Sequence, residues 1–478
     1  MAKQSWISNY EAYVETILDK YQVPGAAIGV KKDGEVIYER GFGKRNVEEK
    51  LEVNEDTIFG IASITKSFTG VAIMQLQERG ELSVEDKVVT YLPELNLSNK
   101  KHTEQVTIHH LLTHTAGLPP LPTLYHAMRR TMENDSSVSL EQMERVKSHE
   151  SIETYDELMS FIGQLDLELL GKPGEEFSYS NDSYALLGAI IERVSGVSYD
   201  VYVTENILKP VGMVNSTFKI DEVLQSDNVT TIYASDEKDG EKEVYASETW
   251  WDSHAMCAGG FLRSTLKDML RYSEIYRNQG KVGESRIITP ESVQEMIHPH
   301  VPFQDNKYYG YGLMITPHYN GGTLVEHGGS LKGVSSNMGV VPEKGLACVV
   351  LNNLAGVPAA KLMVAGFNAV QDIEPETPLV TFSDYEISEV DLDQYVGSYK
   401  SGEGAEITIT KEEGELYYKS EGQPIQMRPV GNHLFTIEIS ESESPIRFLF
   451  DEQGEVRGLF HGVRQILKAL EVEEVEAN

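Results

Sequence analysis

The chain has 478 residues, of which 40% are hydrophobic and 24% are charged. This length exceeds what one ordinary hydrophobic core accommodates, so two domains are expected. The 75 acidic and 41 basic residues give a formal net charge of −34, and so acidic a surface repels nucleic acids and anionic membranes. The composition therefore predicts a globular protein with no nucleic-acid partner and no membrane partner.

The N-terminal segment and the cysteines bear on the compartment and on cofactors. Residues 1–22 lack the basic head and apolar run of a cleaved secretory signal, and no stretch approaches the roughly 18 uninterrupted apolar residues of a membrane span. We therefore expect a cytoplasmic protein. Cys257 and Cys348 lie in apolar or small-residue stretches, away from other ligands, which favours buried free thiols and predicts no metal and no cofactor.

The chain opens with a predicted helix and hairpin. Apolar residues of Trp6–Lys20 recur with the period of an amphipathic helix. The β-like runs Ala26–Val30 and Val36–Tyr38 flank Asp33-Gly34, a strong hairpin signal. An antiparallel pair of strands is therefore expected at the start of the first domain.

The middle of the chain is rich in predicted helices. Ser67–Glu78 and Ser183–Ser195 each carry an apolar face. In contrast, Leu121–Ser160 is polar and charged, without a steady period. We interpret it as an insertion that either overhangs a cleft or is a solvated excursion.

Strand-like runs return after Tyr309 and predict one sheet that joins the two ends of the first domain. Prolines and acids interrupt the apolar pattern at Gln371–Glu389. Short strands then follow at a spacing of about ten residues, which predicts a small antiparallel barrel or sandwich. We expect a catalytic domain at 1–372, a linker at 373–388 and a β-domain at 389–478. The predicted strands are Gly312–Ile315, Gly322–Glu326, Ser335–Val341 and Leu346–Leu351 in the first domain, and Glu406–Thr410, Leu416–Lys419, Leu434–Ile439, Ile446–Phe450 and Val456–Phe460 in the second.

Ser63 and Lys66 form the first candidate site element, at the point where a strand-like segment gives way to the apolar helix. Residues three apart share a helix face, so the two side chains should meet. A partly desolvated lysine can accept a hydroxyl proton, and the helix N-terminus favours the developing oxyanion. The spacing alone is weak evidence, because it recurs at Ser98/Lys101, Ser216/Lys219, Ser235/Lys238 and Ser264/Lys267.

Tyr179 and Asn181 form the second element, in a predicted loop before the Ser183 helix. A tyrosine beside an ammonium group can act as a base or proton shuttle. Asn181 offers a donor and an acceptor to a substrate amide. A buried tyrosine with a helix-capping asparagine is the structural alternative.

His327, Gly329 and Ser330 form the third element, which we expect to terminate a strand-like run. Glycines let a substrate backbone lie against a strand edge. The N–H groups of Ser330 and Ser63 would form a two-donor oxyanion hole. The alternative is a glycine turn with a structural histidine.

Other histidines and tyrosines of the sequence are weaker candidates for a functional site. His109, His110 and His114 are interpreted as structural or helix-capping, without carboxylates at ligand spacing. The alternating tyrosines Tyr308, Tyr309 and Tyr311 are interpreted as core or rim aromatics.

Taken in order, Ser63-x-x-Lys66, Tyr179-x-Asn181 and His327-x-Gly329 resemble the active-site elements of serine beta-lactamase-like and penicillin-binding proteins. The resemblance spans roughly residues 10 to 360. It implies an α/β (α+β) fold, with an antiparallel sheet flanked by helices and a helical subdomain. It also implies acyl-enzyme chemistry, in which Ser63 attacks a carbonyl and Lys66 and Tyr179 relay the proton. Which of the two is the principal base stays open.

One departure from that pattern concerns the substrate. Beta-lactamases and carboxypeptidases usually carry a lysine where this chain has His327, and a neutral imidazole does not pair a substrate carboxylate as a lysine does. The His-x-Gly form is similar to D-aminopeptidases and related peptidases, which also carry lipocalin-like β-domains. Residues from Leu392 onward resemble such a domain, which in relatives shapes the cleft or mediates assembly, so a homo-oligomer is among the expected states.

We therefore expect a serine hydrolase whose substrate is a small peptide, amide or ester. A peptidase or amidase for short peptides or aminoacyl amides, D-configured ones included, is the first hypothesis. A carboxylesterase is the second. A penicillin-binding or sensory protein with weak beta-lactamase activity is the third.

Overall fold

The computed structural model separates into two compact units. The first comprises Met1–Ala116, Thr123–Asp166 and Asn181–Thr377, and the second Gly117–Pro122, Leu167–Ser180 and Pro378–Asn478. Residue 388 of the predicted linker and residues 470–478 of the predicted β-domain lie outside the described residues. The domain limits expected from the sequence stay a prediction. The structure describes residues 2–238, 241–247, 249–387, 389–420, 422–439 and 442–469.

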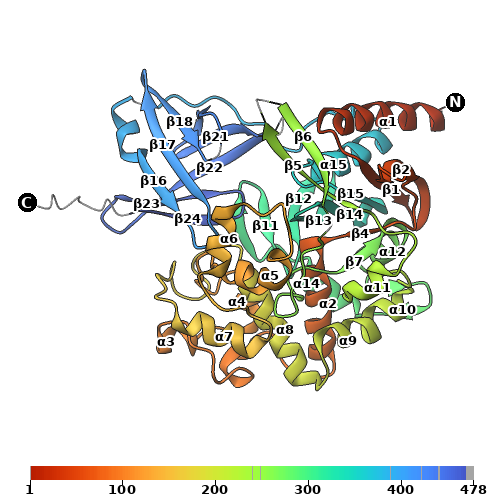
Figure 1. Ribbon diagram of the computed structural model, residues 1–478, viewed down its shortest axis with the longest axis horizontal. Helices are drawn as coiled ribbons and strands as arrows, with labels where there is room; N and C mark the ends of the chain where they lie inside the picture. Colours follow the sequence, from red (N-terminus) through yellow and green to blue (C-terminus); the bar gives the residue numbers. More distant parts are fainter. Residues whose placement is uncertain are drawn as a thin grey trace, which may run out of the picture. The chain divides into compact units, whose positions relative to one another are not determined.

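An antiparallel sheet forms the centre of the first unit (Figure 1). Its strand order is β10-β11-β12-β13-β14-β15-β1-β2-β3. Because β1 pairs with β15, with Ala26 opposite Asn352, the sheet joins the two ends of this unit, as predicted. The strands are β1 (Gly25–Lys32), β2 (Glu35–Asn46), β3 (Leu51–Glu52), β10 (Val301–Gln304), β11 (Lys307–Tyr309), β12 (Met314–Tyr319), β13 (Gly322–Leu331), β14 (Val334–Val341) and β15 (Leu346–Asn352).

Helices cover both faces of this sheet. Gly29 points toward α12 (Leu266–Tyr272), since a Cβ added there would lie 2.7 Å from Leu270 Cδ1. Val30 follows Gly29 on β1, so its side chain points to the other face of the sheet. Cys348 is paired with Val30 and therefore lies on that second face too. On that face lie α15 (Ala359–Val370) and, against α15, the predicted N-terminal helix α1 (Ala2–Lys20).

The helical part of the unit is built around α2 (Thr65–Glu78), which is buried from Thr65 to Leu76. It packs against α8 (Asn181–Ser195) and α9 (Tyr199–Val203). This confirms both helices predicted around Ser67 and Ser183.

The insertion at 121–160 is helical, although its sequence shows no steady period. It forms α5 (Thr123–Met132), α6 (Leu140–Lys147) and the start of α7 (Tyr155–Gln164). Capping boxes at Ser139 and Thr154 start α6 and α7. These helices span only two or three turns each, so no single period runs through the segment.

Short elements complete the first unit. They are β4 (Ile58–Gly60) paired with β7 (Arg263–Thr265), β5 (Ile232–Lys238) with β6 (Glu241–Ser247), β8 (Lys281–Val282) with β9 (Ser285–Arg286), and the helices α3 (Lys100–Thr103), α4 (Ile108–Leu112), α10 (Lys209–Val211), α11 (Ile220–Leu224), α13 (Glu274–Arg277) and α14 (Pro290–Met296).

A second antiparallel sheet forms the centre of the other unit, in the order β19-β18-β17-β16-β24-β23-β22-β21-β20. Contacts between β19 and β21 close it nearly into a barrel, around a core that includes Tyr399, Phe435 and Phe448. The predicted small β-barrel and the α/β fold class are therefore confirmed. The strands are β16 (Gly397–Lys400), β17 (Glu406–Glu412), β18 (Glu415–Lys419), β19 (Ile425–Gln426), β20 (Arg428–Gly431), β21 (Leu434–Ile439), β22 (Ser442–Phe450), β23 (Val456–His461) and β24 (Arg464–Lys468).

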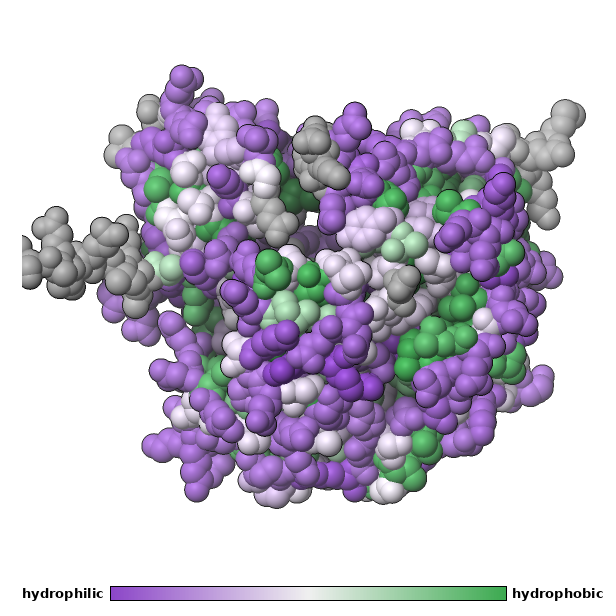
Figure 2. Space-filling view, in the orientation of Figure 1, coloured by the Kyte–Doolittle hydropathy of each residue, from purple (hydrophilic) through white to green (hydrophobic). Residues whose placement is uncertain are grey.

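The hydrophilic surface and the burial of the two cysteines match what the sequence predicts. Hydrophilic residues dominate the face shown in Figure 2, in keeping with 24% charged residues. Cys257 and Cys348 are buried free thiols, as predicted. Within the described part of the chain, no helix is both long and apolar enough to cross a bilayer.

Candidate active site

Ser63 lies in a short 3-10 turn, Ala62–Ile64, between β4 and α2. Its side chain is half-buried while Ala62 and Ile64 are buried. Ala62 has a φ of 43°, a left-handed conformation that costs a residue with a Cβ and persists only where the surroundings impose it. Here Thr65 Oγ1 donates to Ala62 O at 2.6 Å. The turn thus presents the Ser63 hydroxyl just before the first residue of α2.

Lys66 carries its amine directly beside that hydroxyl. Its Nζ lies 3.3 Å from Ser63 Oγ, 2.9 Å from Asn181 Oδ1 and 2.6 Å from Gly259 O. The side chain is fully buried, and its Nζ is 5.5 Å from the centroid of the Tyr184 ring. The predicted contact between residues three apart is therefore present. The acceptors fix the amine in place so that it faces the Ser63 hydroxyl.

Asn181 and Tyr179 are close in sequence but differ in their setting. Asn181 is the first residue of α8 and not part of a preceding loop, and it brings its amide oxygen to Lys66. Tyr179 belongs to the second unit. There its N–H donates to Val463 O at 2.9 Å, and its ring centroid lies 5.0 Å from the guanidinium of Arg464.

His327 sits inside β13, which corrects the expectation that His327-Gly328-Gly329 terminates the strand. The pairing with β14 continues from His327 opposite Met338 to Leu331 opposite Val334. On the other side, the described ladder to β12 reaches Glu326, opposite Met314. The stretch beyond Glu326 is therefore the part of β13 with an edge suited to an extended substrate.

The imidazole of His327 is buried and neutral. Its Nδ1 lies 2.6 Å from Gly328 O, so Nδ1 carries the proton, and Nε2 accepts from the Tyr309 hydroxyl at 3.0 Å. Burial, and then the charge of Lys66, lower the pKa of His327 to about 3, although the bond to Gly328 opposes the shift. The side chain thus contributes polarity to the site and no positive charge near neutral pH.

Gly329 brings β13 against the turn that carries Ser63. A Cβ on Gly329 would lie 2.2 Å from Ile61 O and 3.1 Å from Ala62 Cβ, so only glycine permits this approach. Ser330 follows as an exposed residue of the same strand. The structure therefore brings Ser63, Lys66, Asn181, His327 and Gly329 together in the first unit. The oxyanion role of the Ser330 N–H stays a prediction.

Two groups of this arrangement were missed in the sequence. The sequence indicates a core or rim aromatic at Tyr309. The structure shows a buried side chain whose hydroxyl also donates to His327 Nε2. The carbonyl of Gly259 accepts from Lys66. Its only signal was the small-residue stretch Ala258-Gly259-Gly260, because a backbone acceptor has no residue type of its own.

An ion pair holds the far end of β13. Lys332, in the turn between β13 and β14, pairs with Asp135, and their side chains are 8% and 3% exposed. Asp135 also accepts from the indole N–H of Trp251 at 2.7 Å and from the hydroxyl of Ser137 at 2.7 Å. The connection between α5 and α6 is thereby tied to the β13 hairpin.

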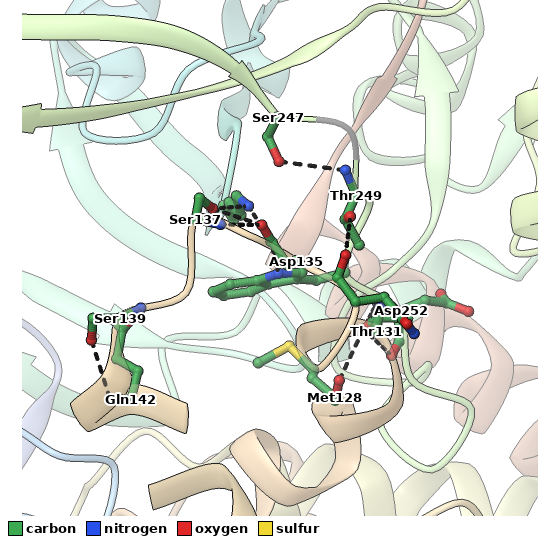
Figure 3. A network of polar contacts seen from close by, with 12 residues as sticks. Met128, Thr131, Asp135, Ser137, Ser139, Gln142, Ser247, Thr249 and Asp252 are labelled. Carbon is green, nitrogen blue, oxygen red and sulfur yellow. Dashed lines mark hydrogen bonds and ion pairs between the residues drawn. The ribbon is translucent and has the colours of Figure 1, made fainter. Parts of the chain in front are cut away.

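The same network reaches the strand before Ser63. Figure 3 shows Asp135 and Ser137 in one set of polar contacts with Thr131 and Asp252. The Asp252 N–H donates to Thr131 Oγ1 at 3.2 Å, and Arg263 Nη1 donates to Asp252 Oδ1 at 2.8 Å. Since Arg263 pairs with Gly60 on β4, these contacts extend to the strand that leads into the Ser63 turn.

Comparisons with known proteins identify the family and the fold of the chain. A family model described as Beta-lactamase matches residues 10–368. Penicillin-binding protein 4* of Bacillus subtilis (strain 168) is 26% identical over 442 residues, or 88% of this chain and 89% of that protein. The solved octameric penicillin-binding protein homologue from Pyrococcus abyssi is 29% identical, with a TM-score of 0.69 over 97% of this chain and 100% of that one.

Protein flp of Staphylococcus aureus (strain MRSA252) is 28% identical over 356 residues, or 74% of this chain. The match spans 64% of that protein's length, and 38% of the length of flp from strain MW2.

Proposed function

This chain belongs to the beta-lactamase family of serine hydrolases, and from that premise we propose that it hydrolyses short peptides or aminoacyl amides through an acyl-enzyme on Ser63. One observation carries the proposal: the buried Lys66 amine faces Ser63 Oγ at 3.3 Å. A lysine held this way can take the hydroxyl proton as the oxygen attacks a carbonyl carbon.

The steps follow from the groups present. Ser63 Oγ bonds to the substrate carbonyl carbon while its proton passes to the Lys66 and Tyr179 pair. The oxyanion is met by the N–H groups of Ser63 and Ser330. The bond from carbon to the leaving nitrogen breaks, and the amine leaves with that proton. Water then attacks the acyl carbon, gives its proton to the same pair, and Ser63 recovers it as the acid product leaves.

Tyr179 enters this proposal through chain connectivity and chemistry. It precedes Asn181 by two residues, so their Cα atoms lie within about 7.6 Å of each other, and Asn181 Oδ1 accepts from Lys66. A phenol can hand a proton between the amine and the leaving group.

The choice of substrate class rests on His327. A neutral imidazole on the substrate strand offers no fixed charge to the carboxylate of a β-lactam or a peptide C-terminus, and the lowered pKa of His327 keeps it neutral. Substrates without that carboxylate, such as aminoacyl amides of D- or L-configuration, suit the site better. Short-chain esters are the second candidate, because acyl-serine chemistry does not by itself distinguish an amide from an ester.

A panel of chromogenic D- and L-aminoacyl amides, short-chain esters and nitrocefin tests the proposal. We expect multiple turnover of one amide class, slow reaction of nitrocefin, and loss of all activity in Ser63→Ala. Ser98→Ala is the matched control, since Ser98 heads another Ser-x-x-Lys copy at the surface, and it should keep activity within about twofold. Unchanged turnover in Ser63→Ala would refute the mechanism.

The same panel separates the alternatives. Turnover of esters without amides would make the protein a carboxylesterase. A stable Ser63 adduct with a fluorescent penicillin, without multiple turnover of any substrate, would indicate a penicillin-binding or sensory protein. Intact-mass spectrometry of wild type and Ser63→Ala after mixing with each substrate detects that adduct.

We also propose that the protein assembles as a homo-oligomer. Support comes from the related Pyrococcus abyssi protein, which is described as octameric and matches 97% of this chain. Light scattering after size-exclusion chromatography tests this, and a mass of one chain, 53.4 kDa, at micromolar concentration would refute it.

A further inference from the structure

We propose that Arg464 and Gln465 are positioning residues for Tyr179: Arg464 holds positive charge over the Tyr179 ring, and Gln465 anchors the segment that carries Tyr179. Both are the first residues of β24. The inference rests on the proposed function, in which Tyr179 shares the proton transfer with Lys66.

The Tyr179 segment is built into the second unit. Leu167–Ser180 clusters with the strands of the β-barrel and not with the sheet of the first unit. The N–H of Tyr179 donates to Val463 O at 2.9 Å, and the N–H of Gln465 donates to Ser178 Oγ at 3.2 Å. The turn between β23 and β24 thus fixes the backbone on which the phenol is mounted.

Gln465 reinforces this attachment with its side chain. It is 2% exposed, and its Nε2 donates to Phe177 O at 3.2 Å and to Glu176 Oε2 at 2.7 Å. Its Oε1 accepts from Arg457 Nη2 at 3.3 Å. A buried amide with these bonds leaves polar groups unpaired when it is truncated, so the segment would lose its fixed position.

Arg464 places a positive charge beside the Tyr179 ring. Its guanidinium carbon lies 5.0 Å from the centroid of the Tyr179 ring. The Arg464 side chain is 28% exposed and pairs with Glu403, which is 15% exposed, so the cation is held and partly shielded from water. A cation at this distance stabilises negative charge on the phenol oxygen and so favours a tyrosine that accepts a proton.

The backbone of Arg464 pairs with His461 in the barrel, whereas its guanidinium forms the ion pair with Glu403 and the contact with the Tyr179 ring. Arg447 provides a comparison in the same unit. Its guanidinium lies 5.3 Å from the centroid of Phe460, a ring that has no ionisable group. Removal of Arg447 therefore reports the loss of a similar contact without any effect on a proton acceptor.

A double-mutant cycle on the full chain tests the role of Arg464. The kcat/KM of Arg464→Met and Arg447→Met is measured against pH, each with Tyr179 present and with Tyr179→Phe, on the substrate that the wild type turns over best. We expect Arg464→Met to lose about tenfold in kcat/KM, which lies between the values of an exposed and a desolvated cation–π contact, and its pH profile to move toward alkaline pH. Arg447→Met should stay within about twofold.

The Tyr179→Phe background of the cycle shows whether Arg464 acts through the phenol of Tyr179 or only stabilises the fold. There, Arg464→Met should cost nothing further, since the phenol it supports is gone. An equal loss in both backgrounds would overturn the inference, as would full activity of Arg464→Met while Tyr179→Phe is impaired by about 10²-fold. Wild-type activity of Tyr179→Phe would instead refute the proposed proton relay, and this inference with it.

The anchoring role of Gln465 is tested separately, by kcat and KM. Gln465→Ala should lower kcat and leave KM nearly unchanged, because it displaces a proton-handling group and no substrate contact. Thermal melting of the same sample checks that the protein is folded. A folded Gln465→Ala with wild-type kcat would overturn the anchoring role.

Discussion

The imidazole of His327 and the phenol of Tyr309 form a buried pair in which Nε2 accepts from the hydroxyl at 3.0 Å. Nδ1 is occupied by the carbonyl of Gly328 at 2.6 Å. Both ring nitrogens therefore have the partners that one neutral tautomer requires. A second proton would break the bond that Nε2 accepts from Tyr309, and the positive ring would be repelled by the charge of Lys66. The third site element is thereby a fixed, uncharged group.

This neutrality predicts how stability depends on pH. The pKa of His327 is lowered to about 3 by burial, against about 6.5 in an unfolded chain. Between these values the unfolded chain binds a proton that the folded protein does not, so the free energy of unfolding falls as pH falls below about 6.5. The contribution is up to about 1.4 kcal/mol per pH unit.

Urea unfolding of wild type and His327→Gln from pH 7.5 to 4.5 measures this contribution, since glutamine does not titrate. The difference in unfolding free energy between the two should shrink as the pH falls. A difference that is constant with pH would contradict a neutral His327.

Gly329 and Gly328 make a matched pair for testing the approach of β13 to the Ser63 turn. A Cβ on Gly329 would meet Ile61 O at 2.2 Å, whereas one on Gly328 has its nearest neighbour, Asn337 Nδ2, at 3.3 Å. Gly329→Ala should lower kcat/KM by about 10²-fold, because a displacement of about 1 Å of the strand disorders the site. Gly328→Ala should stay within about threefold. Similar losses in both would argue against a specific contact.

Much of this architecture could be predicted because its causes are local. The Ser63 and Lys66 contact follows from helical spacing, and the hairpin of β1 and β2 follows from Asp33-Gly34. Apolar alternation within each segment predicts the barrel strands β17, β18, β21, β22 and β23, although not β16, β19, β20 and β24. Each of these features depends on residues that are close in sequence.

The features that were missed depend on tertiary contacts. Glycines weaken a strand in isolation, so β13 was expected to stop at Glu326. It continues because its backbone pairs with β14 as far as Leu331, and Gly329 lets this stretch approach Ile61. The bond of Tyr309 to His327 joins β11 to β13 and depends on the register of β12 between them. No short-range pattern encodes that register.

Asn181 offers a test of the amine of Lys66. Asn181→Asp would place a carboxylate at the position of the Oδ1 atom that now lies 2.9 Å from Nζ, which stabilises the charged ammonium form of the lysine. Less amine is then available as base, so the acid limb of the kcat/KM profile should move to higher pH. An aspartate as the first residue of α8 is compatible with the helix, so the variant should fold.

Asn206→Asp is the control for Asn181→Asp. Its Oδ1 accepts from Arg79 Nη2 at 2.9 Å, so it adds the same charge next to a cation outside the site. Its pH profile should match the wild type. An unmoved acid limb in Asn181→Asp would show that Lys66 is not the base that sets this limb.

The ion pair of Lys332 with Asp135 should contribute to stability mainly through the cost of breaking it. Both side chains are nearly buried, so Asp135→Ala leaves an unpaired ammonium and should cost about 3–5 kcal/mol of unfolding free energy. The double variant Asp135→Asn/Lys332→Met removes both charges and should recover much of that loss.

The control is Glu104→Ala, which breaks the exposed ion pair between Glu104 and Lys100. Their side chains are 54% and 88% exposed, respectively, so this variant should cost at most about 1 kcal/mol. Urea unfolding measures all three variants. Equal costs for the single and double variants would mean that the charge of Lys332 is not buried in the folded protein, because a hydrated ammonium needs no partner.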